Sequence, residues 1–112
     1  MKLRKTVTFN DLYKRRYDLG GIKFRVVKVQ VWGTGDPDEL NDYFPPLVSS
    51  LGRLELAGKF KVVSVARLGR QNWFQLEADG ENTPVATALE IDLDSQEIFD
   101  HVASMQVIIE SI

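Results

Sequence analysis

The chain has 112 residues, 44% of them hydrophobic and 27% charged, which is the composition of one soluble globular domain spanning residues 1–112. It contains no cysteine, and this excludes disulfides, cysteine-bound zinc, iron–sulfur clusters and thiol catalysis. Its single histidine, His101, excludes a multi-histidine metal centre, so we expect neither a metal nor a cofactor.

Charge is distributed unevenly along the chain. The net charge is −2, yet residues 2–28 contain nine lysines and arginines against two aspartates, and the remainder is strongly acidic. Such a basic segment could bind nucleic acid, or pair with acidic residues of its own chain or of a partner subunit. The acidic overall balance argues against nucleic acid. No apolar run approaches the roughly 20 residues of a membrane helix and no signal peptide is visible, so we expect a cytoplasmic protein.

The first part of the chain predicts a short helix and then a strand. Asn10 or Asp11 caps a helix that runs to about Leu19, where a glycine pair ends it. Residues 22–32 alternate and are rich in β-branched and aromatic side chains, which predicts a strand. A turn is expected at 33–35.

A second helical region is expected next. Asp36 followed by Pro37 is a typical helix start, and the apolar spacing predicts a helix over 37–44. The proline pair at 45–46 interrupts it, because proline lacks an N–H donor and disfavours helix in the residue before it. A further short helix is expected to end at Gly52.

The rest of the chain predicts strands. They are, in order, 59–68, 72–78 and 84–93, with turns at 68–71, 78–82 and 94–96. Residues 97–109 are expected to form a last strand pairing with the preceding one, although their apolar spacing also fits a helix. Together these elements predict an α+β fold, a curved antiparallel sheet with helices packed on its concave face and a cleft between the layers.

A family resemblance enters at residues 88–106, ALEIDLDSQEIFDHVASMQ. This strand, acidic turn and histidine segment resembles the last hairpin of SnoaL-like polyketide cyclases in the nuclear transport factor 2-like superfamily. The resemblance covers roughly residues 33–110 and implies a cone-shaped α+β barrel, here with shortened N-terminal helices. The family carries tryptophan and then aspartate where this chain has Val102 and Ala103. Because that aspartate is the acid/base residue of the cyclases, cyclase chemistry does not carry over.

The candidate catalytic residue is His101. Alternation along a strand places it on one face with Phe99 and Met105, and the resemblance makes this the cavity face. There His101 could transfer protons, since its ordinary pKa lies near neutrality; alternatively it is a structural histidine. Glu90 on the preceding strand either pairs with His101 in the cavity or faces solvent as an ordinary strand carboxylate.

Large aromatic side chains supply the remaining candidates. Trp32, Tyr43 and Phe44 either line a ligand pocket or belong to the core. Trp73 shares its strand parity with Gln75, on the polar side, where a monomer would leave an indole exposed. These two residues therefore predict an interface and a homodimer.

Three functions are compatible with these observations. The leading hypothesis is a protein that binds a small apolar ligand or a partner through an apolar cavity, without cyclase activity. The first alternative is an isomerase or cyclase-type enzyme that uses His101 for proton transfer. The second is a nucleic-acid-associated protein that uses the basic segment 2–28. Whether the protein is an enzyme is left open.

Overall fold

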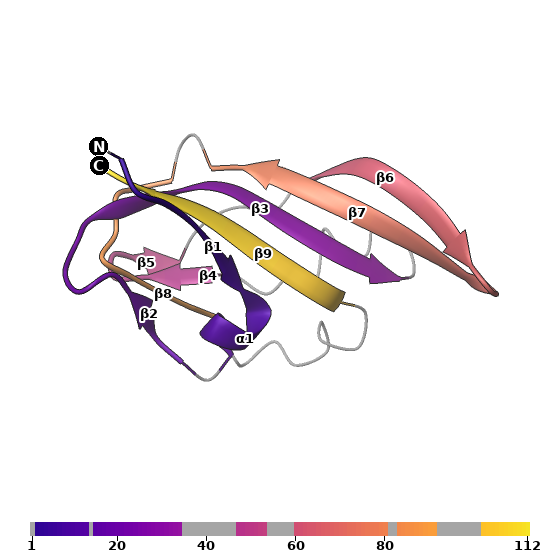
Figure 1. Cartoon of the computed structure of the whole chain (residues 1–112), viewed down its shortest axis with the longest axis horizontal. Helices are drawn as coiled ribbons and strands as arrows, with labels where there is room; N and C mark the ends of the chain where they lie inside the picture. Colours follow the sequence, from indigo (N-terminus) through magenta and orange to yellow (C-terminus); the bar gives the residue numbers. More distant parts are fainter. Residues whose placement is uncertain (1, 14, 35–46, 54–59, 81–82, 92–101) are drawn as a thin grey trace.

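The computed structural model describes residues 2–13, 15–34, 47–53, 60–80, 83–91 and 102–112. Over these residues the protein is 68% strand and 5% helical, and its strands form two antiparallel sheets (Figure 1). The expected α+β fold, a cone-shaped barrel with helices packed on the sheet, is therefore wrong. The described core lies between two sheets instead of between a sheet and helices.

The larger sheet has five strands. In spatial order these are β1 (Arg4–Thr8), β9 (Val102–Ser111), β3 (Phe24–Thr34), β7 (Gln71–Asp79) and β6 (Lys61–Leu68). Every neighbouring pair is antiparallel. The sheet is long, and its β6–β7 hairpin extends well beyond the smaller sheet, forming the tip at the right of Figure 1.

The smaller sheet has four short strands. They are ordered β2 (Tyr17–Asp18), β8 (Ala88–Ile91), β4 (Leu47–Ser49) and β5 (Gly52–Arg53), again all antiparallel. This sheet covers one end of the larger sheet (Figure 1). No helix of the described residues is long and apolar enough to cross a membrane.

The core fills the space between the sheets with side chains that alternate along each strand. The larger sheet supplies Val7, Val29, Val31, Met105, Val107 and Ile109, and the smaller one supplies Leu47, Leu89 and Ile91. All nine are at most 4% exposed. Each such aliphatic side chain stabilises the fold by about 1.5–3 kcal/mol relative to leaving it in water.

A β-bulge in β3 preserves this alternation along an 11-residue strand. Phe24 and Val26 face the core before the bulge and Val29 and Val31 face it afterwards, because the register against β9 shifts between Val26 and Lys28. The extra residue rotates the strand so that both apolar stretches point inward. The expected strand 22–32 is thus confirmed with its bounds shifted to 24–34, and residues 33–34 of the expected turn belong to the strand instead, because they pair with β7.

The chain crosses between the sheets beside this bulge. After β7, the Gly80 N–H donates to the Val27 carbonyl (3.1 Å), and the Thr83 hydroxyl lies 2.9 Å from the Val26 carbonyl oxygen. Backbone groups at a bulge are left without ladder partners, and these contacts satisfy them. Phe24 and Ala86 then exchange two backbone hydrogen bonds of 2.8 Å, which lead the chain into β8.

The N-terminal helix is much shorter than expected. α1 spans Phe9–Leu12 only, and its N-cap is Thr8, not Asn10 or Asp11. Leu12 is fully buried, and Tyr17 already belongs to β2. Extending a single helical turn adds little stability, because helix formation becomes favourable only over several turns. The pairing of residues 17–18 with β8 therefore outweighs the helical spacing of the apolar residues in this segment.

The second helical region is also wrong where it is described. Residues 47–49 and 52–53 form β4 and β5, joined by a tight turn at 50–51, where a helix ending at Gly52 was expected. Leu47 and Ser49 are buried with Val48 between them half-buried, which is the period of a strand. The expected helix 37–44 lies outside the described residues.

The expected strands are largely confirmed, but two of their pairings are wrong. The hairpin turn at 68–71 is present, with Gly69 at a φ of 65°. By contrast, β7 pairs with β3 and β6 instead of β8, and β9 pairs with β1 and β3 instead of β8. Residues 102–109 form the expected strand, while 97–101 lie outside the described part of the chain.

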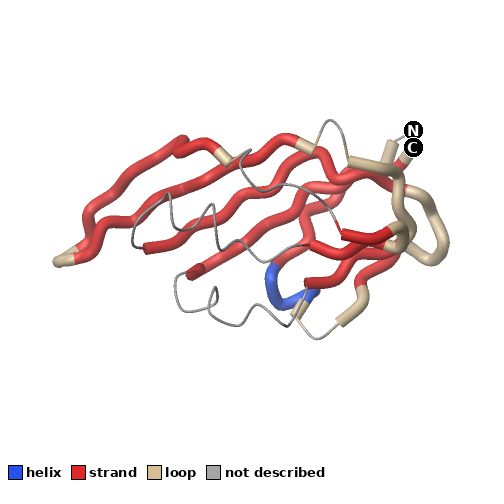
Figure 2. Tube along the Cα trace, turned by 180° about the vertical axis from the view of Figure 1, so that it is seen from behind, coloured by secondary structure: helices blue, strands red, loops and turns tan. Residues whose placement is uncertain are grey.

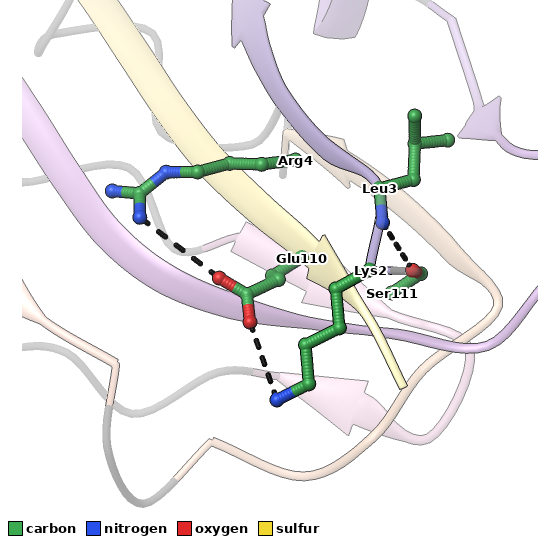
Figure 3. Close-up of polar contacts among 5 residues, drawn as sticks. All are labelled: Lys2, Leu3, Arg4, Glu110 and Ser111. Carbon is green, nitrogen blue, oxygen red and sulfur yellow. Dashed lines mark hydrogen bonds and ion pairs between the residues drawn. The ribbon is translucent and has the colours of Figure 1, made fainter.

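The two ends of the chain lie side by side, as the view from behind also shows (Figure 2). The Leu3 N–H donates to the Ser111 hydroxyl (2.7 Å), and Lys2 and Arg4 form ion pairs of 3.4 and 3.9 Å with Glu110 (Figure 3). Exposed ion pairs of this kind contribute about 0–1 kcal/mol. They nonetheless pair part of the basic segment with an acidic residue of the same chain.

Candidate ligand-binding site

The structure forms a groove on the outer face of the larger sheet, the face turned away from the core. Its volume is about 290 Å³. The described residues that line it come from β3, β7 and β9, the three central strands: Gln30, Val31, Trp32, Gln75, Ser104 and Gln106.

Strand register brings these side chains together. Trp32 lies opposite Ser104 on one side and opposite Gln75 on the other, so the three form one row across the sheet. Gln30 lies opposite Gln106 in the next row of side chains on the outer face. Directly opposite residues of an antiparallel pair are about 5 Å apart, so the groove is assembled from immediate neighbours that are far apart in sequence.

Trp32, the aromatic wall of the groove, stacks on a second tryptophan of the same sheet face. Trp32 and Trp73 are diagonal neighbours on β3 and β7, and their rings stack with centroids 6.1 Å apart and planes inclined by 22°. Offset stacking of this kind contributes about 0.5–1.5 kcal/mol beyond the buried area. Both indoles are half-buried, so Trp32 is fixed in orientation and still contacts the groove.

One amide of the groove is oriented by a charged partner. The Gln30 side-chain N–H donates to a Glu77 carboxylate oxygen over 2.8 Å, and the other Glu77 oxygen lies 3.7 Å from the Lys28 ammonium. The Gln30 carbonyl oxygen is therefore available as an acceptor, with one N–H still to donate. The charges of Lys28 and Glu77 neutralise each other, so this pair adds no net charge beside the groove.

The described lining carries hydrogen-bonding side chains and none that ionises near neutral pH. Three primary amides and one hydroxyl provide donors and acceptors, and one indole provides a flat apolar wall. Such a set can orient an uncharged ligand but contains no nucleophile–base pair. Within the described ranges, no group of three or more histidine, cysteine or acidic side chains could hold a metal ion.

The structure places in one groove residues for which the sequence predicted two different roles. Trp32, expected as a ligand contact, and Gln75, expected at an interface, line the same groove, and Trp73 stacks on Trp32 on the same face of the sheet. Met105 is 2% exposed and belongs to the core between the sheets. The candidates Tyr43, Phe44, Phe99 and His101 lie outside the described residues.

Glu90 lies away from the groove, on the smaller sheet. It is exposed on β8, opposite Val48, while its neighbours Leu89 and Ile91 point into the core. The outward orientation expected of an ordinary strand carboxylate is therefore what the structure shows. Glu90 borders a second hollow of about 250 Å³, whose other described lining residues are Arg16, Val48, Ser49, Ser50, Ala88 and Leu89.

Four of the groove residues, Gln30, Val31, Ser104 and Gln106, were not selected as site residues from the sequence. Gln30 shares its strand parity with Trp32, and Ser104 and Gln106 share one face of the last strand, opposite the face chosen as the cavity face. The polar parity of each strand was visible, but the pairing of β9 with β3 that joins them was not.

Comparisons with protein-family models, with curated proteins and with solved structures found no match to this chain. The resemblance of residues 33–110 to the SnoaL-like cyclases therefore stays a prediction, while the fold that it implies is not the one observed.

Proposed function

We propose that this protein binds a neutral saccharide in the groove on the outer face of its larger sheet. The observation that carries the proposal is the row Ser104–Trp32–Gln75 with the glutamine pair Gln30 and Gln106 beside it. A sugar ring offers C–H groups that pack on an indole face and hydroxyls that both donate and accept, as amides do.

The polarity of the lining favours this ligand over an apolar one. A purely hydrophobic molecule would desolvate the amides without replacing their hydrogen bonds, at a cost of about 1–3 kcal/mol for each unsatisfied group. Charge favours a neutral saccharide over a nucleic acid. The cation beside the groove, Lys28, already forms an ion pair with Glu77, and Glu77 brings a carboxylate to the groove rim. A phosphate backbone needs unpaired cations along its path.

The test is titration with a panel of neutral oligosaccharides built from glucose, galactose, mannose or N-acetylglucosamine, followed by calorimetry and tryptophan emission. We expect one class to bind and Trp32→Ala to weaken it at least tenfold, with Trp32→Phe intermediate. Gln75→Ala and Gln106→Ala should each weaken binding by about fivefold, the equivalent of one hydrogen bond.

The matched control is Gln71→Ala. Gln71 is an exposed glutamine on β7 with the same strand parity as Gln75, and it does not line the groove. It should leave the affinity unchanged. Failure of the whole panel to bind at millimolar concentration, or equal affinity for the Trp32→Ala protein with its circular dichroism unchanged, would refute the proposal.

A further inference from the structure

A second surface with binding character is the edge strand β6 at the tip of the larger sheet. Among the described strands it pairs only with β7. Its sequence is KVVSVARL, and Val62, Val63, Val65 and Leu68 are 45–62% exposed. An edge strand presents a row of unpaired N–H and C=O groups, and exposed apolar side chains along it favour pairing with another strand.

The apolar side chains lie on both faces of this edge. Val65 is opposite Phe74 on the core side of the sheet, and Leu68 is opposite Gln71 on the outer side. A bulge between Val62 and Ser64 leaves residues 64–68 as the regular stretch of the strand. An added strand would cover apolar surface on both faces while pairing with the backbone of this stretch.

The charge of the edge is uniformly positive. Residues 61–70 contain Lys61, Arg67 and Arg70, all exposed, and no acidic residue. Antiparallel pairing of β6 with β6 of a second copy would bring both sets of cations to one seam without a carboxylate on either strand. An acidic strand instead places opposite charges across the pairing.

We propose that β6 binds an extended peptide segment in which apolar and acidic residues alternate, by addition of a strand to the larger sheet. Backbone hydrogen bonds supply the affinity. Side chains of the added strand alternate between the two faces of the sheet, so its apolar side chains pack beside Val62 and Val65 on the core side, and its acidic side chains lie on the outer side with Lys61. Arg67, on the core side, adds to the positive charge of the edge. This edge adjoins the saccharide groove, because Ser64 lies opposite the groove residue Gln75, but strand addition uses the free backbone of β6 and does not depend on saccharide binding.

The probes are synthetic octapeptides that alternate valine with glutamate or valine with lysine. A third peptide carries proline at two alternate positions of the glutamate version, which removes N–H donors from the backbone. We expect binding of the glutamate peptide only, measured by calorimetry, and an amide chemical-shift change confined to β6 and its neighbours. Equal affinity for the lysine or the proline peptide would overturn the proposal, as would no binding of the glutamate peptide.

Charge reversal on the protein sharpens this test. The double variant Lys61→Glu and Arg67→Glu should bind the glutamate peptide at least tenfold more weakly than the parent chain and should gain affinity for the lysine peptide. The control is Lys23→Glu combined with Lys5→Glu, two exposed lysines outside β6 and the same change in net charge. An unchanged preference in the β6 variant overturns the proposal. If the protein self-associates, and if this association is lost in Val65→Thr but retained in Trp73→Glu, then a second copy of the chain binds β6 and the peptide proposal is wrong.

Discussion

At the residue scale, Gly80, where the chain leaves β7 for the smaller sheet, has no room for a side chain. A Cβ at this residue would overlap the carbonyl oxygen of Val26, a backbone atom beside the bulge that cannot move without disturbing the β3 ladder. The Gly80 N–H is also held by the Val27 carbonyl. Close backbone approach, and not a left-handed conformation, is the reason for glycine here.

We therefore expect Gly80→Ala to lower the free energy of unfolding by about 3 kcal/mol or more, as other overpacking changes of the backbone do. Urea denaturation measures the change. Gly69→Ala is the matched control, because a Cβ at Gly69 meets nothing within 4 Å and only its φ of 65° is unfavourable, at about 1 kcal/mol. Equal losses in the two variants would contradict the close-approach account.

At the element scale, the longer strands were predictable from sequence, while residues 17–18 and 47–52, expected to be helical, lie in strands and a turn instead. The β3, β6 and β7 segments are long and rich in β-branched or aromatic side chains, which predicts strands. The apolar spacing of the β9 segment also fitted a helix, and its pairing with β1 and β3 decides for a strand. Near Tyr17 and Leu47 the spacing fits a helix equally well, and strand pairing with β8 decides the outcome. Local pattern cannot report such a partner, because the partner is distant in sequence.

The single described helix turn depends on a carboxylate, which gives it a pH dependence. The Thr8 N–H (2.9 Å) and the Thr8 hydroxyl (3.0 Å) both donate to one oxygen of Asp11. The backbone hydrogen bond, then the hydroxyl, and to a smaller degree the charge of Arg15 lower the pKa of Asp11 below its ordinary 3.8, although slight desolvation opposes them. A lowered folded-state pKa stabilises the fold above the unfolded-state value, and this stabilisation is lost as pH falls through the folded-state pKa.

Asp11→Asn should accordingly be less stable than the parent chain at pH 7, and the gap should close as pH falls below about 4. Chemical denaturation of both proteins at intervals from pH 7 to pH 2 gives the difference. A gap of constant size across this range would mean that the charge of Asp11 does not stabilise the α1 turn.

At the scale of the whole molecule, the missing information was which sheet each strand joins. Hairpin pairing of consecutive strands predicted one meander, yet β8 follows β7 into a different sheet and β9 returns to the first between β1 and β3. Alternation of apolar and polar residues shows which side chains share a face of a strand, but it does not show which strands pair. Trp32, Trp73 and Gln75 could therefore be chosen from sequence, while their union with Ser104 and Gln106 in one groove needed the β3–β7 and β3–β9 registers.

The same outer face carries the expected homodimer, which stays a prediction. Trp73 is half-buried by its stacking on Trp32, so a second copy would complete the burial of both indoles. Such a dimer would cover the groove, and a ligand that binds the groove would then favour the monomer by mass action. Dimerisation and saccharide binding are thus expected to compete.

Sedimentation at micromolar concentration should show a dimer whose fraction falls when the oligosaccharide that binds is added at saturating concentration. Trp73→Glu should be monomeric at every concentration, because a buried carboxylate without a partner is unfavourable at an interface. Arg70→Glu, an exposed change on the turn between β6 and β7, should leave the dimer intact. A parent chain that sediments as a monomer, or a dimer that persists in Trp73→Glu, would mean that the stacked tryptophans serve one chain alone.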